Sequence, residues 1–341
     1  MNRPGRLARK LWLARRPRAA ILVYHRVADL DCDPFLLAVT PRHFAEHLAV
    51  LKEQYVPIGL TELADAVRRQ SVPHRAVVLT FDDGYGDNLR QAKPLLENRR
   101  APATVFVVAG KVGSQEEFWW DELERLVLRP SRLPAKLELE IGGRHRHWEI
   151  GDGGAKVASG VDGRWNMKQG VDPSPRHRLY RELWGALHVL VDADREELMK
   201  KIRAWANLDA APRAENLPLS AAEVSELASG GSVEIGAHGW THSRLADLHA
   251  DEQRQELRVA RRRLEGILGT PVKSFAYPYG GRGDYTPETR AIVAEAGFEC
   301  ACANQSGWVI GGADCFELPR VRVFDWDGRE FARRLKRFLW A

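Results

Sequence analysis

The chain lacks any apolar run long enough to cross a membrane. In its 341 residues, no stretch approaches the ~20 consecutive apolar residues that a membrane-spanning helix needs. The N-terminus does not resemble a secretory signal either, because the run LWLA is too short and the next run, AAILVY, continues into a motif that belongs to the fold. These absences favour a cytoplasmic protein.

Cysteine is also scarce, with four residues in the whole chain: Cys32, Cys300, Cys302 and Cys315. None of them has zinc-ribbon spacing. Cys300 and Cys302 lie two apart on an expected strand, where they share a face and are poorly placed to bond each other. We therefore expect buried thiols in a reducing compartment.

An excess of charge of one sign is absent as well. The 51 basic and 46 acidic residues give a net charge of +5, well short of a composition that coats nucleic acid, and no zinc-finger or RNA-recognition motif appears. We expect no nucleic-acid partner. Basic residues concentrate at the two ends, and residues 1–18 carry seven Arg or Lys and no acid. These basic ends could make peripheral contact with a membrane.

The C-terminal segment REFARRLKRFLWA has the pattern of an amphipathic helix. Its apolar residues fall on one face of such a helix, and they are Phe331, Leu335, Phe338 and Leu339. That face could rest on an anionic membrane or a partner, or it could pack on its own domain with the arginines in water. The sequence leaves both interpretations open.

What the chain does have is a regular alternation of apolar and amphipathic segments. The apolar runs span residues 19–25, 76–83, 103–110, 232–238, 272–279 and 298–303, and helical patterns span 41–54, 86–100, 250–269 and 286–297. Apolar strands alternating with amphipathic helices predict an α/β fold with a parallel sheet, either open or closed into a barrel. In both arrangements chemistry collects at the carboxyl ends of the strands.

A long interruption at residues 114–217 divides this pattern. We predict a basic N-terminal segment at 1–18, a main domain made of 19–113 and 218–341, and an α+β insertion at 114–217. The insertion contains a probable hairpin (135–150) and a helical segment (176–206). It also holds six of the eleven tryptophans: Trp119, Trp120, Trp148, Trp165, Trp184 and Trp205. They could stack on sugar rings, or they could form the insertion's own core.

Titratable residues stand at the ends of three of the expected strands. The run VVLTFDDG ends in Asp82 and Asp83, which could simply open a turn before a glycine. A second run ends in HGWTH, where His238 and His242 would meet on one side of a helical turn, and a third ends in His25. Because parallel strands end at the same edge, these groups should converge, and two imidazoles with one carboxylate make an open three-ligand metal site.

Three motifs in this order, TFDDG, HGWTH and FAYPYG, resemble those of the polysaccharide deacetylase family, also described as the NodB-homology domain or carbohydrate esterase family 4. The resemblance covers about residues 20–110 and 218–325 and leaves the insertion outside. It implies a distorted (β/α) barrel of about seven parallel strands. It also implies a hydrolase that acts on non-peptide carbon–nitrogen bonds and removes N-acetyl groups from an N-acetylated sugar. Its substrate would be a polysaccharide, such as an exopolysaccharide, or a lipid- or nucleotide-linked precursor.

The resemblance also implies roles for individual residues. Asp82 would be the general base, and a divalent metal, most often zinc, would be held by Asp83, His238 and His242. The backbone N–H of Tyr279 would help to hold the oxyanion. The motif VYHRV matches the branch with an N-terminal catalytic histidine, which implies that His25, as an imidazolium, protonates the departing amine.

The sequence departs from the family pattern at two places. Ala276 stands where the family has an arginine that orients the base, and Arg320 in the later run LPRVRV could supply that charge instead. Gly239 stands where Ser or Thr is usual, so a hydrogen bond near the metal could be missing. These departures leave two alternatives open. One is another amide hydrolase of the superfamily, such as a deformylase or a ureide hydrolase, and the other is a carbohydrate-binding relative without catalysis.

Overall fold

A single parallel sheet forms the centre of the computed structural model, which describes residues 17–151, 165–207 and 211–340. The strands run in the order β12-β11-β10-β9-β6-β5-β1-β13, and β4 pairs with the start of β5. Their bounds are β1 Ala20–Tyr24, β4 Val56–Pro57, β5 Ala76–Phe81, β6 Ala103–Val107, β9 Val233–Ala237, β10 Ser274–Ala276, β11 Cys300–Ala303, β12 Leu318–Pro319 and β13 Val321–Arg322. Every residue of β1 and β5 is buried, as expected of strands covered on both faces.

The sheet closes into a barrel through one short segment near the end of the chain. β12 pairs with β11 in the register Cys302↔Leu318, whereas β13 pairs with β1 in the register Leu22↔Val321. Only Arg320 separates β12 from β13, so this segment joins the two ends of the sheet. Counted as one interrupted strand, it completes a ring of seven, which confirms the predicted distorted (β/α) barrel.

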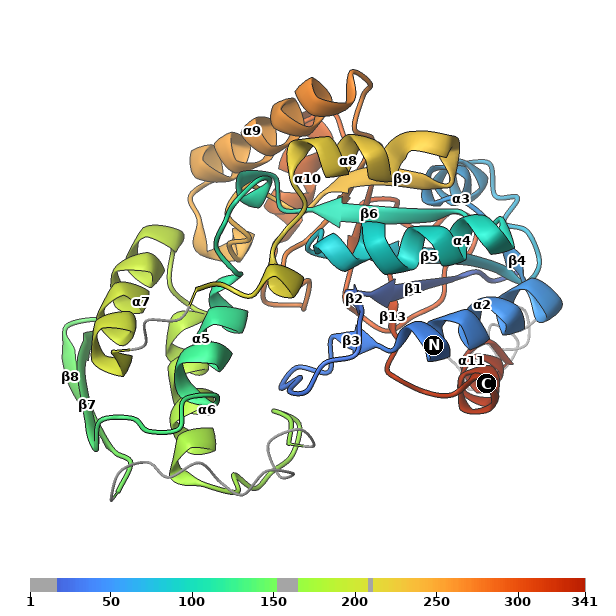
Figure 1. The fold of residues 1–341 in the computed structure, drawn as a ribbon. Coiled ribbons are helices and arrows are strands. Elements are labelled where there is room, and N and C mark those ends of the chain that lie inside the picture. The colour runs from blue at the N-terminus through green and yellow to red at the C-terminus, as the bar shows by residue number, and fades with distance from the viewer. Residues whose placement is uncertain (1–16, 152–164, 208–210, 341) are drawn as a thin grey trace, which may run out of the picture.

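Helices cover the outside of this barrel (Figure 1). Their bounds are α2 Pro41–Gln54, α3 Leu60–Arg68, α4 Lys93–Arg99, α8 Ala221–Ala228, α9 Ala250–Leu268, α10 Pro287–Glu295 and α11 Gly328–Trp340. Local sequence sets several of their ends. The Thr40 side chain accepts a hydrogen bond from the His43 backbone N–H at the start of α2, and α9 ends at Gly269, whose φ of 68° suits a residue without a side chain.

The insertion forms a second unit with its own hydrophobic core, at the left of Figure 1. Its elements are α5 Trp119–Val127, β7 Lys136–Ile141, β8 Arg144–Glu149, α6 Pro175–Leu187 and α7 Asp192–Ala206. β7 and β8 form the predicted antiparallel hairpin. The predicted helical segment 176–206 is two helices, because the chain leaves the helical conformation after α6 and Val191, which directly precedes α7, is extended. The break lets both helices pack their apolar sides into one core.

The C-terminal helix α11 packs its apolar face on the barrel domain. Phe331, Leu335 and Leu339 are buried in the same hydrophobic cluster as the leucines of α2. This is the packing interpretation of the amphipathic pattern. Within the described residues, no helix is both long and apolar enough to span a membrane. The predicted basic segment 1–18 lies almost entirely outside the described residues.

Candidate active site

One cavity of about 390 Å³ gathers all of the predicted site residues at the carboxyl ends of the strands. They are His25, Asp82, Asp83, His238, His242, Tyr279 and Arg320. They follow β1, β5, β9 and β10, or stand between β12 and β13. The parallel topology therefore brings together residues that are as much as 295 positions apart in the sequence.

Asp83, His238 and His242 form a compact set of metal-binding atoms. The Asp83 Oδ1 atom lies 3.4 Å from His242 Nε2 and 3.6 Å from His238 Nε2, and one ligand atom from each residue lies within 4.8 Å of the others. All three residues are buried. His238 Nδ1 donates to the Ala276 carbonyl at 2.8 Å, which leaves its Nε2 lone pair directed at Asp83.

The protonation states of this set suit a divalent cation. Burial lowers the pKa of His238 and lowers that of His242 to about 3, so both imidazoles are neutral at neutral pH. Neutral imidazoles and a carboxylate are the ligands of open zinc sites. Without a cation, burial raises the pKa of the Asp83 carboxyl. The residues present therefore fit the metal that the sequence predicted.

The backbone that presents these ligands is not the helical turn expected from the i, i+4 spacing. Residues 238–242 form a loop in which Gly239 has a φ of 79° and His242 a φ of 61°. The loop is held by Glu256, which accepts hydrogen bonds from the backbone N–H groups of Trp240 and Thr241 at 2.9 and 2.6 Å. Two positive φ angles, not a helical turn, bring the imidazole rings to a centroid separation of 4.9 Å.

Asp83 has the same kind of strained backbone, with a φ of 76°. A non-glycine residue with positive φ costs free energy that the surrounding structure must offset, and such residues cluster at functional sites. Gly84 follows with a φ of 80°, and a Cβ atom there would lie 3.1 Å from the Val107 side chain. The turn that follows β5 therefore forms, but its geometry directs the Asp83 carboxylate at the two histidines.

Asp82 is held by Arg320 through two parallel hydrogen bonds. Arg320 Nη1 donates to Oδ1 and Nη2 to Oδ2, each at 2.7 Å, and both side chains are fully buried. Burial alone would raise the pKa of Asp82, but the charge of Arg320, followed by that of His238, holds it well below the usual range. In the family pattern an arginine at the position of Ala276 orients this carboxylate. Arg320 contacts the carboxylate here instead.

Tyr279 and His25 complete the predicted set. Tyr279 has a φ of 60°, and its backbone N–H has no hydrogen-bond acceptor within the described residues. Asn304 positions this loop, since its side-chain amide donates to the Tyr279 carbonyl at 2.8 Å and its oxygen accepts from Arg320. His25 lines the same cavity, where burial lowers its pKa to about 4 against the opposing charges of Asp83 and Asp82. At neutral pH its imidazole is therefore uncharged, unlike the imidazolium implied by the resemblance.

Several residues of the cavity were not found from the sequence. They are Val23, Phe35, Leu37, Trp120, Trp184, Asn304, Ser306 and Arg322. Two of them, Trp120 and Trp184, come from the insertion, and the Trp120 ring lies 4.9 Å from that of His242. The other insertion tryptophans belong to or pack against the insertion's own core. The core interpretation therefore holds for the other four, whereas stacking of Trp120 and Trp184 on a sugar ring stays a prediction.

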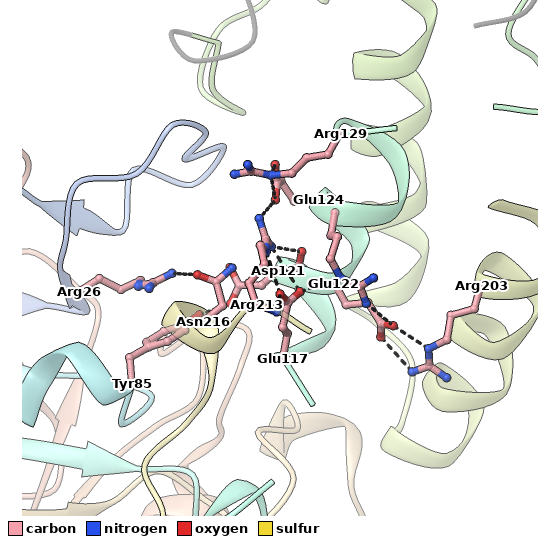
Figure 2. A network of polar contacts seen from close by, with 11 residues as sticks. Arg26, Tyr85, Glu117, Asp121, Glu122, Glu124, Arg129, Arg203, Arg213 and Asn216 are labelled. Carbon is pink, nitrogen blue, oxygen red and sulfur yellow. Dashed lines mark hydrogen bonds and ion pairs between the residues drawn. The ribbon is translucent and has the colours of Figure 1, made fainter. Parts of the chain in front are cut away.

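A network of buried polar contacts fixes the insertion to the barrel (Figure 2). Tyr85, two residues after Asp83, donates its hydroxyl hydrogen to Asp121 at 2.6 Å and accepts a hydrogen bond from Trp120 Nε1 at 2.8 Å. Arg26 of the barrel domain donates from Nη1 to the Asn216 Oδ1 atom of the insertion at 2.7 Å. Asp121, beside Trp120 on α5, is buried deeply enough to raise its pKa to about 7. These contacts set the position of Trp120 against His242.

Comparison with known proteins agrees with this geometry. The family model described as "Polysaccharide deacetylase" matches residues 69–133 and 201–301. The matched residues therefore form a polysaccharide deacetylase domain. Among solved structures, the Streptococcus pyogenes deacetylase PplD in complex with acetate is 17% identical, with a TM-score of 0.57 over 93% of this chain and 98% of that one. At this identity, the match shows a shared fold.

Two curated relatives match shorter segments. The "Putative polysaccharide deacetylase YxkH" of Bacillus subtilis is 26% identical over 108 residues, 31% of this chain and 37% of that protein. The "Poly-beta-1,6-N-acetyl-D-glucosamine N-deacetylase" of Escherichia coli K12 is 34% identical over 82 residues, 24% of this chain and 12% of that protein. The matched segments thus span well under half the length of either relative.

Proposed function

We propose that this protein is a metal-dependent hydrolase that removes N-acetyl groups from an N-acetylated sugar, in a polysaccharide or in its lipid- or nucleotide-linked precursor. One observation carries the proposal. In a single cavity, the three-residue set Asp83, His238 and His242 faces a carboxylate, Asp82, that is held separately by Arg320. The similarity to the poly-beta-1,6-N-acetyl-D-glucosamine N-deacetylase of Escherichia coli supports the substrate class.

The two adjacent aspartates would have different tasks because their surroundings differ. Asp83, His238 and His242 would hold a divalent metal such as zinc, which when bound makes water more acidic and polarises the acyl carbonyl. Asp82 stays ionised because of Arg320, and it would accept the proton of the water that attacks the acyl carbon. Its depressed pKa makes it a weak base, so this transfer depends on a water already made acidic.

Arg320 would act as a positioning residue for that base. Its planar guanidinium fixes both oxygens of Asp82, which a lysine ammonium cannot do. Arg320 and Asp82 lie where the barrel closes. Arg320 also donates a hydrogen bond to the side chain of Asn304, and Asn304 in turn donates to the Tyr279 carbonyl. One hydrogen-bonded chain would therefore align the base with the loop that offers the Tyr279 N–H to the oxyanion.

His25 would protonate the departing amine, but the resting enzyme would not carry that proton. With a pKa of about 4, the imidazole is neutral at neutral pH. His25 would therefore take up a proton from solvent water during turnover, once a negative charge develops beside it, and Asp82 would return the proton that it accepted to solvent. A group with so low a pKa gives up its proton readily, which suits donation to an amine leaving group.

An acetate-release assay on a panel of N-acetylated saccharides tests this function. The protein, loaded with zinc, is incubated with N-acetylglucosamine oligomers, a sugar nucleotide and a lipid-linked N-acetylated sugar. We expect acetate from at least one of them, abolished in Asp82→Asn. Release of formate from N-formyl analogues only, or ring opening of a cyclic ureide, would replace the proposed reaction by another of the superfamily.

A further inference from the structure

Arg322 is a cavity residue for which the proposed chemistry has no use. It stands on β13, two residues after Arg320, and lines the same cavity. Its Nη2 atom donates to the backbone carbonyls of Phe35 and Leu36, at a distance of 3.3 Å for Leu36. These bonds hold a strained loop, since Leu36 has a φ of 55°. Part of the guanidinium therefore has a structural task.

The remaining donors of Arg322 are unused. Nε is buried without a hydrogen-bond partner, and no acceptor for Nη1 occurs within residues 17–151, 165–207 and 211–340. A buried donor without an acceptor costs free energy comparable to a lost hydrogen bond, and more when the group is charged. Arginine remains protonated at neutral pH. The cavity wall therefore carries a positive charge whose Nε and Nη1 groups are available to donate hydrogen bonds.

Each nearby carboxylate is already engaged elsewhere. Asp82 is bound by Arg320, and Asp83 faces the two histidines. Asp33, the acid that acts most strongly on Arg322, accepts hydrogen bonds from the backbone N–H groups of Leu37 and Ala38 at 2.9 and 2.8 Å. In the described part of the chain, no carboxylate lies within ion-pair distance of Arg322.

A second cation without a carboxylate partner in the described part of the chain contacts the same aromatic ring as Arg322. Lys168, from the insertion, lies with its Nζ 3.8 Å from the ring centroid of Phe324, and the guanidinium carbon of Arg322 lies 5.2 Å from the same centroid. Partial burial, and then the charge of Arg322, lower the pKa of Lys168. Lys168 also has no carboxylate partner among the described residues. Two cations on one aromatic ring, neither paired with a carboxylate of the described residues, attract an anion.

We propose that Arg322 and Lys168 form a subsite for an anionic group of the substrate, such as a phosphate or a carboxylate on the saccharide. The inference rests on the proposed function and narrows its substrate class. A charged saccharide would place its acetamido group at Asp82 and its anionic oxygens at Arg322. A guanidinium and an ammonium together suit an anion with several oxygens, which offers an acceptor to each.

An affinity measurement tests the subsite without turnover. N-acetylglucosamine 1-phosphate and uncharged N-acetylglucosamine are titrated calorimetrically into protein dialysed against a chelator, so that no metal holds the phosphate. We expect the phosphorylated sugar to bind at least about tenfold more tightly. Arg322→Gln should remove most of this preference and Lys168→Gln part of it. Equal affinity for the two sugars in the unaltered protein would overturn the proposal.

Two controls separate the charge from the loop. Arg322→Lys keeps the charge but loses the fork geometry, so it should retain more of the preference than Arg322→Gln. Lys52→Gln removes an exposed charge from α2 and should change neither affinity. Arg322→Gln could instead weaken the binding of both sugars equally, with no effect of Lys168→Gln on either affinity. In that case Arg322 only holds the loop, and the subsite does not exist.

Kinetics then identify the anion and distinguish this inference from the proposed function. With zinc-loaded protein, kcat/KM is compared for a neutral N-acetylated oligomer, a glycosyl phosphate and an oligomer that contains a uronic acid. Preference for one charged substrate supports the subsite and names its anion. Equal kcat/KM for all three refutes the subsite but leaves the deacetylase standing. Tight phosphate binding without acetate release from any substrate refutes the function but leaves the subsite.

Discussion

Arg320 donates a hydrogen bond of 2.7 Å to each carboxylate oxygen of Asp82. Arg320 is also the one residue that separates β12 from β13. The contact that aligns the expected base is therefore also part of the closure of the barrel. Because the pair is fully buried, each charge depends on the other. Removing either partner should affect stability as well as activity.

Arg320→Lys should preserve a positive charge and lose the two parallel hydrogen bonds. We expect kcat to fall by about tenfold to a hundredfold, since small misplacement of a catalytic group has effects of this size. Metal content should not change, because Arg320 contacts none of the three ligands. The acidic limb of the kcat/KM profile should move to higher pH as the pKa of Asp82 rises. Unaltered kcat would show that the base needs no bidentate partner.

Asp82→Asn and Asp83→Asn should separate the two tasks of the adjacent aspartates. The first should abolish turnover and keep the metal, since Asp82 is bound by Arg320. The second should lose metal, because it removes the only carboxylate of the three-ligand set. Elemental analysis of the two purified variants makes the comparison. Loss of metal from Asp82→Asn alone would show that the roles are reversed.

His25→Gln should reduce kcat by about a hundredfold or more while the metal remains, in the range of general acid–base catalysis. The glutamine keeps a polar side chain of similar reach but cannot exchange a proton. An assay with an activated N-acyl substrate, whose leaving group needs no protonation, provides the control. The kcat of His25→Gln on that activated substrate should fall far less. A similar loss on both substrates would assign His25 to substrate or metal positioning instead.

Asp121 should make stability depend on pH. Burial raises its pKa to about 7 in the folded protein, above its value in the unfolded chain. Between about pH 4 and 7 the folded state therefore binds more protons, and the contribution of Asp121 to stability is present at low pH and lost as pH rises. Asp121→Asn, which can still accept from Tyr85, should be more stable at pH 8 by roughly 1–3 kcal/mol. Denaturant unfolding at pH 5 and 8 measures the difference, which should shrink at the lower pH.

The sequence predicted a parallel sheet and its edge of titratable groups for a physical reason, whereas the closure into a barrel was implied by the family resemblance. Strands that are buried on both faces have continuous apolar sequences, so the first polar residue after each apolar run marks the carboxyl end of a strand. The helical pattern over residues 41–54 coincides with α2, and the pattern over 250–269 extends one residue beyond α9, to its capping Gly269. The prediction from spacing was wrong for the backbone of the loop that holds His238 and His242. A separation of four residues suggested a helical turn, whereas two positive φ angles bring the two rings together.

The rest of the site depends on tertiary contacts that no local pattern records. Arg322, Trp120 and Trp184 reach the cavity only after the barrel closes and the insertion packs beside it. The ionisation of Asp82 depends on the charge of Arg320, which lies 238 positions away in the sequence. The low pKa of His25 comes from burial, which sequence alone does not reveal.

Metal stoichiometry tests the central claim most directly. The purified protein, reconstituted with zinc and dialysed, is analysed beside His242→Ala and the matched variant His249→Ala, whose histidine caps α9 outside the cavity. We predict one zinc ion per chain in the unaltered protein and in His249→Ala, and a small fraction of that in His242→Ala. Equal zinc in all three, or none in the unaltered protein, would contradict a metal held by Asp83, His238 and His242.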